Sequence, residues 1–197
     1  MRQKTAEIIS KEICTGCKVC GDLCPTGAIT FTVDEEGFWF PVIDSEKCIS
    51  CGKCFHCCPV NQEKSKNINI EINQGNAPLQ TYAAWNRDDG VRRESTSGGL
   101  FSVFAAYVLS QGGYLAGSAY TDDFKAACHI TAKDKTEAKK LMGSKYFQSD
   151  TAGIYKETKE LLESGKTVLF VGTPCQVAAL YSYLKKRPEN LITVDFI

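Results

Sequence analysis

The stretch CTGCKVCGDLCP at residues 14–25 decides the N-terminal fold, because a second run with the same cysteine spacing, CISCGKCFHCCP, follows at residues 48–59. Each run reads Cys-x2-Cys-x2-Cys-x3-Cys-Pro. Three thiolates at intervals of three residues wrap one turn of chain around a corner of an iron–sulfur cubane, and a fourth completes the ligand set. The two runs therefore predict two [4Fe-4S] clusters in an α+β ferredoxin-like domain, which we place at residues 1–61.

The two ligand sets are expected to be crossed, because in a two-cluster motif the fourth cysteine of each run binds the cluster of the other run. The predicted ligands are Cys14, Cys17, Cys20 and Cys58 for the first cluster, and Cys48, Cys51, Cys54 and Cys24 for the second. The glycines at positions 16, 21 and 52 would let the backbone approach inorganic sulfur closely. A domain of this size has little apolar core, so we expect the clusters to stabilise its fold as well.

The segment between the two runs, residues 28–44, predicts two strands around a Glu-Gly turn. Four of its aromatic side chains are available to shield a cluster from water: Phe31, Phe38, Trp39 and Phe40.

Zinc is the alternative metal for paired Cys-x2-Cys units. A structural zinc site has no use for a third cysteine at the same interval or for the trailing proline, so iron–sulfur clusters are favoured. Cys57 is surplus to the ligand sets, and we interpret it as a buried thiol, with an exchange for Cys58 left open. His56 is interpreted as a surface or shielding side chain.

The composition of the chain limits its class. The 197 residues carry a net charge of zero, which argues against a nucleic-acid partner held by bulk electrostatics. The chain has no run of eighteen apolar residues and no signal peptide at its start, so we expect a cytoplasmic protein without membrane insertion. In a reducing compartment, clustered cysteines indicate metal or redox chemistry rather than disulfides.

A change of composition near residue 61 divides the chain. Residues 62–79 are polar and rich in asparagine, which predicts a linker. Residues 80–197 alternate between strand and helix patterns, so we expect an α/β domain. The last predicted strand reaches the end of the sequence without a closing helix, and we expect this domain to be truncated at its C-terminus.

The elements of the second domain follow from hydrophobic periodicity. We expect strands at residues 81–86, 114–120, 126–132, 167–172 and 191–197, and helices at residues 98–113, 134–142, 149–166 and 175–186. In the first helix, one face is expected to contain Phe101, Phe104, Ala105 and Val108, and Gly112 and Gly113 are expected to end it. Asp134 is the predicted cap of the second helix, Ser149 or Asp150 opens the third, and Gly165 closes it.

Two turns that precede helices are candidate ligand sites. The stretch GTPC at residues 172–175 follows a buried strand, and such a turn directs backbone amides toward an anion, although it is also common as plain packing. Cys175, at the expected start of a helix, is a candidate reactive thiol. The stretch STSGG at residues 95–99 is either a pyrophosphate cradle or an N-cap formed by Ser97.

A third candidate is the loop MGSKYFQS at residues 142–149, where Lys145 offers a cation and Tyr146 or Phe147 a stacking surface. A plain loop is the favoured interpretation from these residues alone. Cys128 and His129 alternate on a predicted strand, where we expect a buried thiol of the core.

Through several of these motifs, the chain resembles the coenzyme F-420 hydrogenase/dehydrogenase beta-subunit family. The resemblance rests on ESTSGGLFSVFAAYVLSQGG, GSKYFQSD, GKTVLFVGTPCQVAAL and NLITVDFI, and covers most of residues 81–197. It implies an FAD that receives electrons from the ferredoxin segment and exchanges a hydride with a deazaflavin or another acceptor. The implied cofactor-binding residues are Ser97, Gly98, Gly99, Ser144, Lys145, Tyr146, Gly172, Thr173, Pro174 and Cys175, with Cys175 and Lys145 as catalytic candidates. The family's Cys-His-Gly segment, which normally continues from the final strand, is absent here.

The sequence is compatible with three functions. The favoured one is an iron–sulfur flavoprotein oxidoreductase subunit that works with ferredoxin or another redox partner protein. The second is a two-cluster electron-transfer protein without catalysis, whose appended domain docks a partner. The third is a redox sensor or zinc module in which Cys175 or Cys57 responds to oxidant.

Overall fold

The computed structural model describes residues 9–61 and 80–196, and the predicted linker lies outside them. The N-terminal unit contains the short helices α2 (Val19–Asp22) and α3 (Lys53–Cys57) and the antiparallel strands β1 (Ile29–Val33) and β2 (Trp39–Ile43). The predicted hairpin is confirmed. The Asp34 carboxylate accepts hydrogen bonds from the backbone of Glu36 and Phe38, and Gly37 supplies the positive φ that this turn needs.

The second unit is built on a mixed sheet of the order β4-β3-β5-β6. Its strands are β3 (Tyr114–Tyr120), β4 (Ala127–Ala132), β5 (Val168–Gly172) and β6 (Leu191–Asp195). β3 pairs with β4 in the antiparallel direction, whereas β3 with β5 and β5 with β6 are parallel. The central β5 is buried on both faces, as its uninterrupted apolar sequence predicts.

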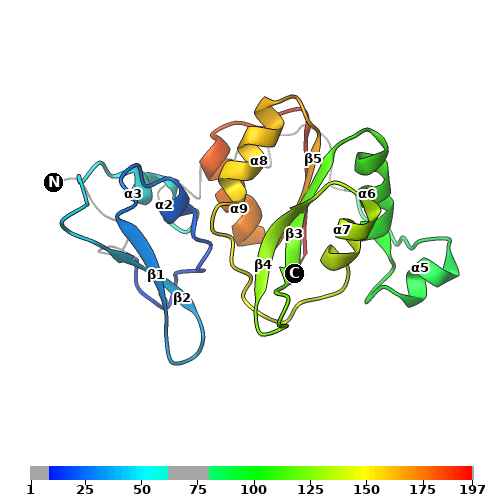
Figure 1. Cartoon of the computed structure of the whole chain (residues 1–197), viewed down its shortest axis with the longest axis horizontal. Helices are drawn as coiled ribbons and strands as arrows, with labels where there is room; N and C mark the ends of the chain where they lie inside the picture. The colour runs from blue at the N-terminus through cyan, green and yellow to red at the C-terminus, as the bar shows by residue number, and fades with distance from the viewer. Residues whose placement is uncertain (1–8, 62–79, 197) are drawn as a thin grey trace.

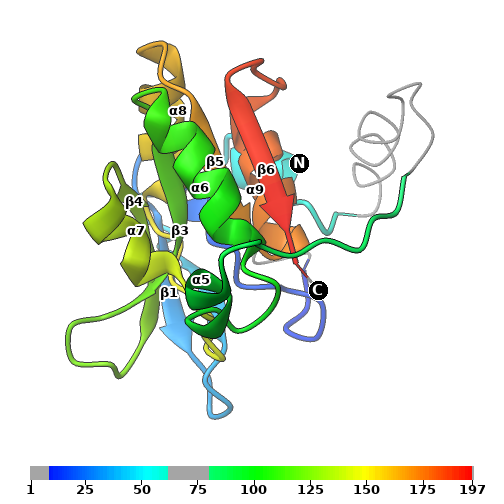
Figure 2. The same cartoon turned by 90° about the vertical axis from the view of Figure 1, so that its right-hand side faces the viewer.

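Helices cover both faces of this sheet (Figures 1 and 2). The apolar side chains of α6 (Leu100–Ser110) and α7 (Lys135–Leu141) form one core with Leu115, Ala119 and Leu169 of the sheet. On the opposite face, α8 (Ile154–Glu163) and α9 (Pro174–Leu184) pack on Ala116, Val168 and Phe170. A short helix, α5 (Asp89–Arg93), precedes α6.

The cluster-bearing unit shares the second of these cores. Cys17, Val19, Cys20 and Cys57 belong to the same buried apolar cluster as the inner faces of α8 and α9. Figure 1 shows the N-terminal unit on the left, directly beside these two helices. The iron–sulfur segment is therefore packed against the α/β domain through side chains that both units bury.

Several predicted boundaries are wrong, although Asp134 caps α7 through the backbone amides of Thr136 and Glu137 as expected. The described residues 81–86 form no strand. α6 begins after Gly99 rather than after Ser97, because Gly99 adopts the left-handed conformation at the cap. α8 likewise begins at Ile154 behind a left-handed Gly153.

Phe104, expected on the apolar face of its helix, and Phe38, expected to be available to shield a cluster, are both exposed. Phe104 is 40% exposed, because the inner face of α6 is formed by Ala105 and Val108. Phe38 is 50% exposed in the hairpin turn, where its amide donates to the Asp34 carboxylate. Among the described residues, no helix is both long and apolar enough to span a bilayer.

Candidate functional site

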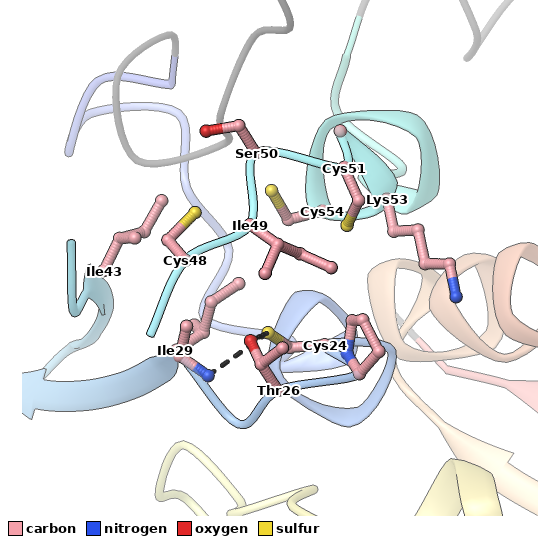
Figure 3. A pocket seen from close by; sticks show the side chains of 13 residues that line it. Cys24, Thr26, Ile29, Ile43, Cys48, Ile49, Ser50, Cys51, Lys53 and Cys54 are labelled. Atoms are coloured by element: carbon pink, nitrogen blue, oxygen red, sulfur yellow. Dashed lines mark hydrogen bonds between the residues drawn. The ribbon is translucent and has the colours of Figure 1, made fainter. Parts of the chain in front are cut away.

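The cysteines of the N-terminal unit surround two small cavities, and each cavity receives its fourth thiol from the other cysteine run. The first cavity is lined by Cys14, Cys17, Cys20 and Cys58. The second is lined by Cys24, Cys48, Cys51 and Cys54. Figure 3 shows Cys48, Cys51 and Cys54 on one side of the second cavity and Cys24 on the facing segment.

The walls of both cavities are mainly apolar. Phe31, Pro41 and Val60 line the first cavity beside its thiols, and Ile29, Ile43 and Ile49 line the second. In the part of the chain that the structure describes, no three Cys, His, Asp or Glu side chains are close enough to share a single metal ion. A [4Fe-4S] cluster takes four thiolates on four different irons, and the donor set around each cavity fits that need.

Burial determines the protonation of these thiols when no metal is bound. Desolvation raises the pKa of Cys17 to about 12 and that of Cys58 to about 11. For Cys24, which is nearer the surface, burial also raises the pKa, but hydrogen bonds from Thr26 and from the Ala28 amide bring it below its ordinary value. The buried thiols therefore need a bound cation to remain thiolates at neutral pH.

Cys57 is the surplus thiol beside Cys58. It is buried and lies outside the lining of both cavities, and its Sγ donates to the backbone oxygen of Cys54 at 3.4 Å. Its side chain packs in the core shared with α8 and α9, which agrees with its interpretation as a buried thiol.

The first cavity is tied to the α/β domain by two buried hydrogen bonds. The backbone oxygen of Cys17 accepts from the Thr151 hydroxyl and from the Tyr155 hydroxyl, each at 2.8 Å. Both donor side chains are fully buried. Burial raises the pKa of Tyr155 well above its ordinary value, so its hydroxyl remains a donor.

Further contacts join the same two regions. Gln148 donates to the backbone oxygen of Thr15 at 3.0 Å and accepts from the Trp39 amide at 2.9 Å. The ammonium group of Lys18 lies 2.8 Å from the Asp150 carboxylate and 3.6 Å from the centre of the Trp39 ring. Lys18 is only 4% exposed, so this buried cation is neutralised from the α/β domain.

A third and larger cavity, of about 420 Å³, lies beside the first. It is at the carboxyl ends of the parallel strands, where α/β sheets commonly bind ligands, and β3 and β5 line it with Gly117, Ser118 and Val171. Its volume is within the range of about 300–1,000 Å³ that is typical of small-molecule sites. Thr15 and Gly16 line both this cavity and the first thiol cavity, so one short stretch of backbone separates them.

The predicted cofactor residues divide into two groups around this third cavity. Ser144, Lys145, Thr173 and Cys175 line it. The other six are outside its lining: Ser97, Gly98, Gly99, Tyr146, Gly172 and Pro174. Tyr146 is 90% exposed, whereas the next residue, Phe147, lines the cavity.

The polar lining is organised by two loops. Thr96, the neighbour of Ser97, places its hydroxyl 3.3 Å from Ser144 Oγ. At the start of α9, the Thr173 amide donates to the Gln176 side chain at 2.9 Å, and Cys175 Sγ lies 3.1 Å from Thr173 Oγ1. These loops bring hydroxyl and thiol groups to the cavity without a GxGxxG or Walker sequence.

Lys145 and His129 are the titratable side chains of the cavity with the largest pKa shifts. Burial lowers the pKa of Lys145 to about 8, while its ammonium donates to the backbone oxygen of Met142 at 2.7 Å. Burial also lowers the pKa of His129 to about 4, so this imidazole is neutral at pH 7. The cavity thus combines one cation with one neutral imidazole.

His129 is a site residue that the sequence did not identify. The strand alternation places its side chain inward. The expectation of a buried Cys128 is therefore wrong, because His129 is the buried residue and Cys128 is only partly buried. Thr15, Gly16 and Gln148 were also missed as lining residues. For His129, a histidine within an apolar strand was the sequence signal that could have indicated a buried polar site.

Comparison with known proteins supports an iron–sulfur function. Residues 13–62 match the 4Fe-4S dicluster domain family. An uncharacterized ferredoxin of Methanocaldococcus jannaschii is 41% identical over 54 residues, which cover 27% of this chain and 69% of that protein. Through this N-terminal segment the chain belongs to the two-cluster ferredoxin-type proteins.

Two longer relatives cover both units. The coenzyme F420-dependent sulfite reductase of Methanocaldococcus jannaschii is 28% identical over 177 residues, or 90% of this chain and 26% of that protein. An F(420)H(2) dehydrogenase subunit of Methanosarcina mazei is 24% identical over 206 residues, or 98% of this chain and 55% of that protein. The chain therefore spans about a quarter of the first relative and about half of the second.

Proposed function

We propose that this chain is an oxidoreductase subunit in which two [4Fe-4S] clusters exchange electrons with a flavin bound in the third cavity. One observation carries the proposal: Thr15 and Gly16 form a wall that is common to the first thiol cavity and to the third cavity. A redox ligand in the third cavity would be next to the cluster held by Cys14, Cys17, Cys20 and Cys58. The set Cys24, Cys48, Cys51 and Cys54 would hold the second cluster.

The residues around the third cavity suit FAD. A flavin, when bound, accepts electrons singly and exchanges them in pairs as a hydride. Phe101, Leu141 and Val171 provide apolar walls for a planar ring. Lys145 supplies a cation for phosphate oxygens, and the hydroxyls of Thr96 and Ser144 supply hydrogen-bond partners.

Two side chains are the candidates for a direct role in the reaction. Cys175 lies at the start of α9, lines the third cavity and is close enough to Cys17 to affect its pKa. Lys145 is partly desolvated in the same cavity. We assign them to the ligand site as groups that contact the bound cofactor or its substrate.

A deazaflavin is the proposed acceptor or donor, because both longer relatives have names that refer to F420. One of these relatives is named as a dehydrogenase subunit, which also supports a redox partner protein. The exposed side chain of Ile49, at 61%, places the edge of the second thiol cavity near the surface, where a partner can approach it.

Anaerobic purification followed by iron, sulfide and flavin analysis tests this function. We expect about eight irons and about eight sulfides per chain, together with one FAD after reconstitution. Full iron content without any flavin uptake would instead favour the second candidate, a two-cluster electron-transfer protein that docks a partner. Iron content near zero after anaerobic reconstitution would contradict both functions.

A further inference from the structure

Two buried polar atoms of the third cavity have no hydrogen-bond partner among the described residues: Ser118 Oγ and His129 Nε2. Both residues line this cavity. They are directly opposite each other in the antiparallel register of β3 and β4, so their side chains leave the sheet on the same face. The Cβ atoms of such a pair are about 4.5–5.5 Å apart, and the two groups can contact one small ligand together.

The His129 ring is held in place by its other contacts. Its Nδ1 lies 2.8 Å from Ser149 Oγ, and the ring stacks on Phe170 with 5.7 Å between the ring centres. His129 is 8% exposed. Because the ring cannot turn to find a partner within the protein, Nε2 keeps a desolvated hydrogen-bonding position that a ligand can satisfy.

The charge of this pair is zero at pH 7. Burial lowers the pKa of His129 to about 4, and the opposing effects of the Val171 backbone and the Asp150 carboxylate are smaller. The Val171 backbone makes a weak hydrogen-bonding contact with the imidazole that raises its pKa slightly, but within the described residues Nε2 has no hydrogen bond of ordinary distance and angle. A neutral imidazole and a hydroxyl offer donor and acceptor positions without attracting an anion.

We propose that Ser118 and His129 bind the polar edge of a planar, uncharged heterocycle that has adjacent N–H and C=O groups, as the pyrimidine part of a flavin ring has. The apolar side chains of Leu141 and Val171 line the same cavity from the α6/α7 side of the sheet. This inference rests on the proposed flavin function and assigns the ring-recognising residues of the site.

Affinity measurements on the cluster-loaded protein test the assignment, with FAD and ADP as probes. ADP has the adenosine pyrophosphate half of FAD but lacks the flavin ring. Ser118→Ala and His129→Leu should each weaken FAD binding about tenfold, the usual effect of one lost hydrogen bond in a buried site, and leave ADP binding unchanged. His129→Gln should restore most of the affinity, because its amide also offers a donor and an acceptor.

Ser182→Ala is the matched control, because Ser182 in α9 also has a buried hydroxyl without a partner among the described residues but lies outside the cavity lining. It should leave the affinity for both probes unchanged. The inference is overturned if the wild type binds FAD and the two cavity variants bind it equally well, or if every variant weakens FAD and ADP alike. A fully loaded wild type that binds no FAD overturns the proposed function and this inference together.

Discussion

Removing both hydroxyl donors from the Cys17 backbone oxygen should destabilise the protein by more than the sum of the two single changes. Tyr155→Phe and Thr151→Val each delete one hydroxyl and keep the shape of the side chain. The two hydrogen bonds are 2.8 Å long, and both donor side chains are fully buried. They connect the α/β domain to a backbone group next to a proposed cluster ligand.

The expected magnitude follows from what each variant leaves behind. After a single substitution the Cys17 oxygen keeps one donor, so the loss should be about 1 kcal/mol. After the double substitution this buried oxygen has neither donor, which adds the cost of an unsatisfied group, about 1–3 kcal/mol. The double variant should therefore lose about 3–5 kcal/mol, with a coupling energy of about 1–3 kcal/mol.

Anaerobic thermal unfolding of the cluster-loaded protein measures this effect. For a chain of this length, each single variant should lower the Tm by about 2–4 °C and the double variant by roughly 10 °C. Tyr181→Phe is the matched control, because the Tyr181 hydroxyl pairs with Thr193 in a partly buried site away from the cysteines. If the stability loss of the double variant equals the sum of the two single losses within about 0.5 kcal/mol, the Cys17 oxygen has another partner and the reasoning fails.

Three further predictions concern the thiols and the third cavity. Cys20→Ser should lower the iron content from about eight toward about four per chain in anaerobic iron analysis, whereas Cys57→Ser should retain about eight. Because burial lowers the pKa of His129 to about 4, unfolded protein takes up a proton near pH 6.5 that folded protein does not. Stability should therefore fall by about 2 kcal/mol between pH 7 and pH 5 in thermal unfolding, and His129→Gln should remove that part of the pH dependence. Burial lowers the pKa of Lys145 to about 8, so ADP binding measured by calorimetry should weaken as the pH rises from 7 to 9, while Lys145→Met should bind weakly at both pH values.

The iron–sulfur unit could be predicted from the sequence because its ligands are set by local spacing. Three cysteines at intervals of three residues can face one cavity within a single turn of chain, without any information from the rest of the fold. The hairpin and β5 could be predicted equally well, since a Glu-Gly turn and a continuous β-branched run are local signals. Asp134 was identified as a cap for the same reason.

The start of a helix was mispredicted where the expected capping residues instead bond to distant parts of the chain. Ser149 and Asp150 are good N-cap residues, yet Ser149 pairs with His129 and Asp150 pairs with Lys18 of the iron–sulfur unit. With both side chains committed, the chain continues to Gly153 and starts α8 there. The segment 81–86 has strand-like residues, but its hydrogen bond from the Asn86 amide goes to Gly98 rather than to a strand.

The third cavity depends on contacts between residues more than 130 positions apart, which no local pattern encodes. Gly16 shows why that contact is close. Its φ of 63° is in the left-handed region, and a Cβ at this position would collide with Gln148 Nε2 and lie 3.0 Å from the Trp39 backbone oxygen. A larger residue would displace the Gln148 side chain, which bonds to the Thr15 oxygen and the Trp39 amide. Since Gly16 also lines both cavities, the residue that allows the two units to pack is the one that keeps the proposed cluster and ligand sites adjacent.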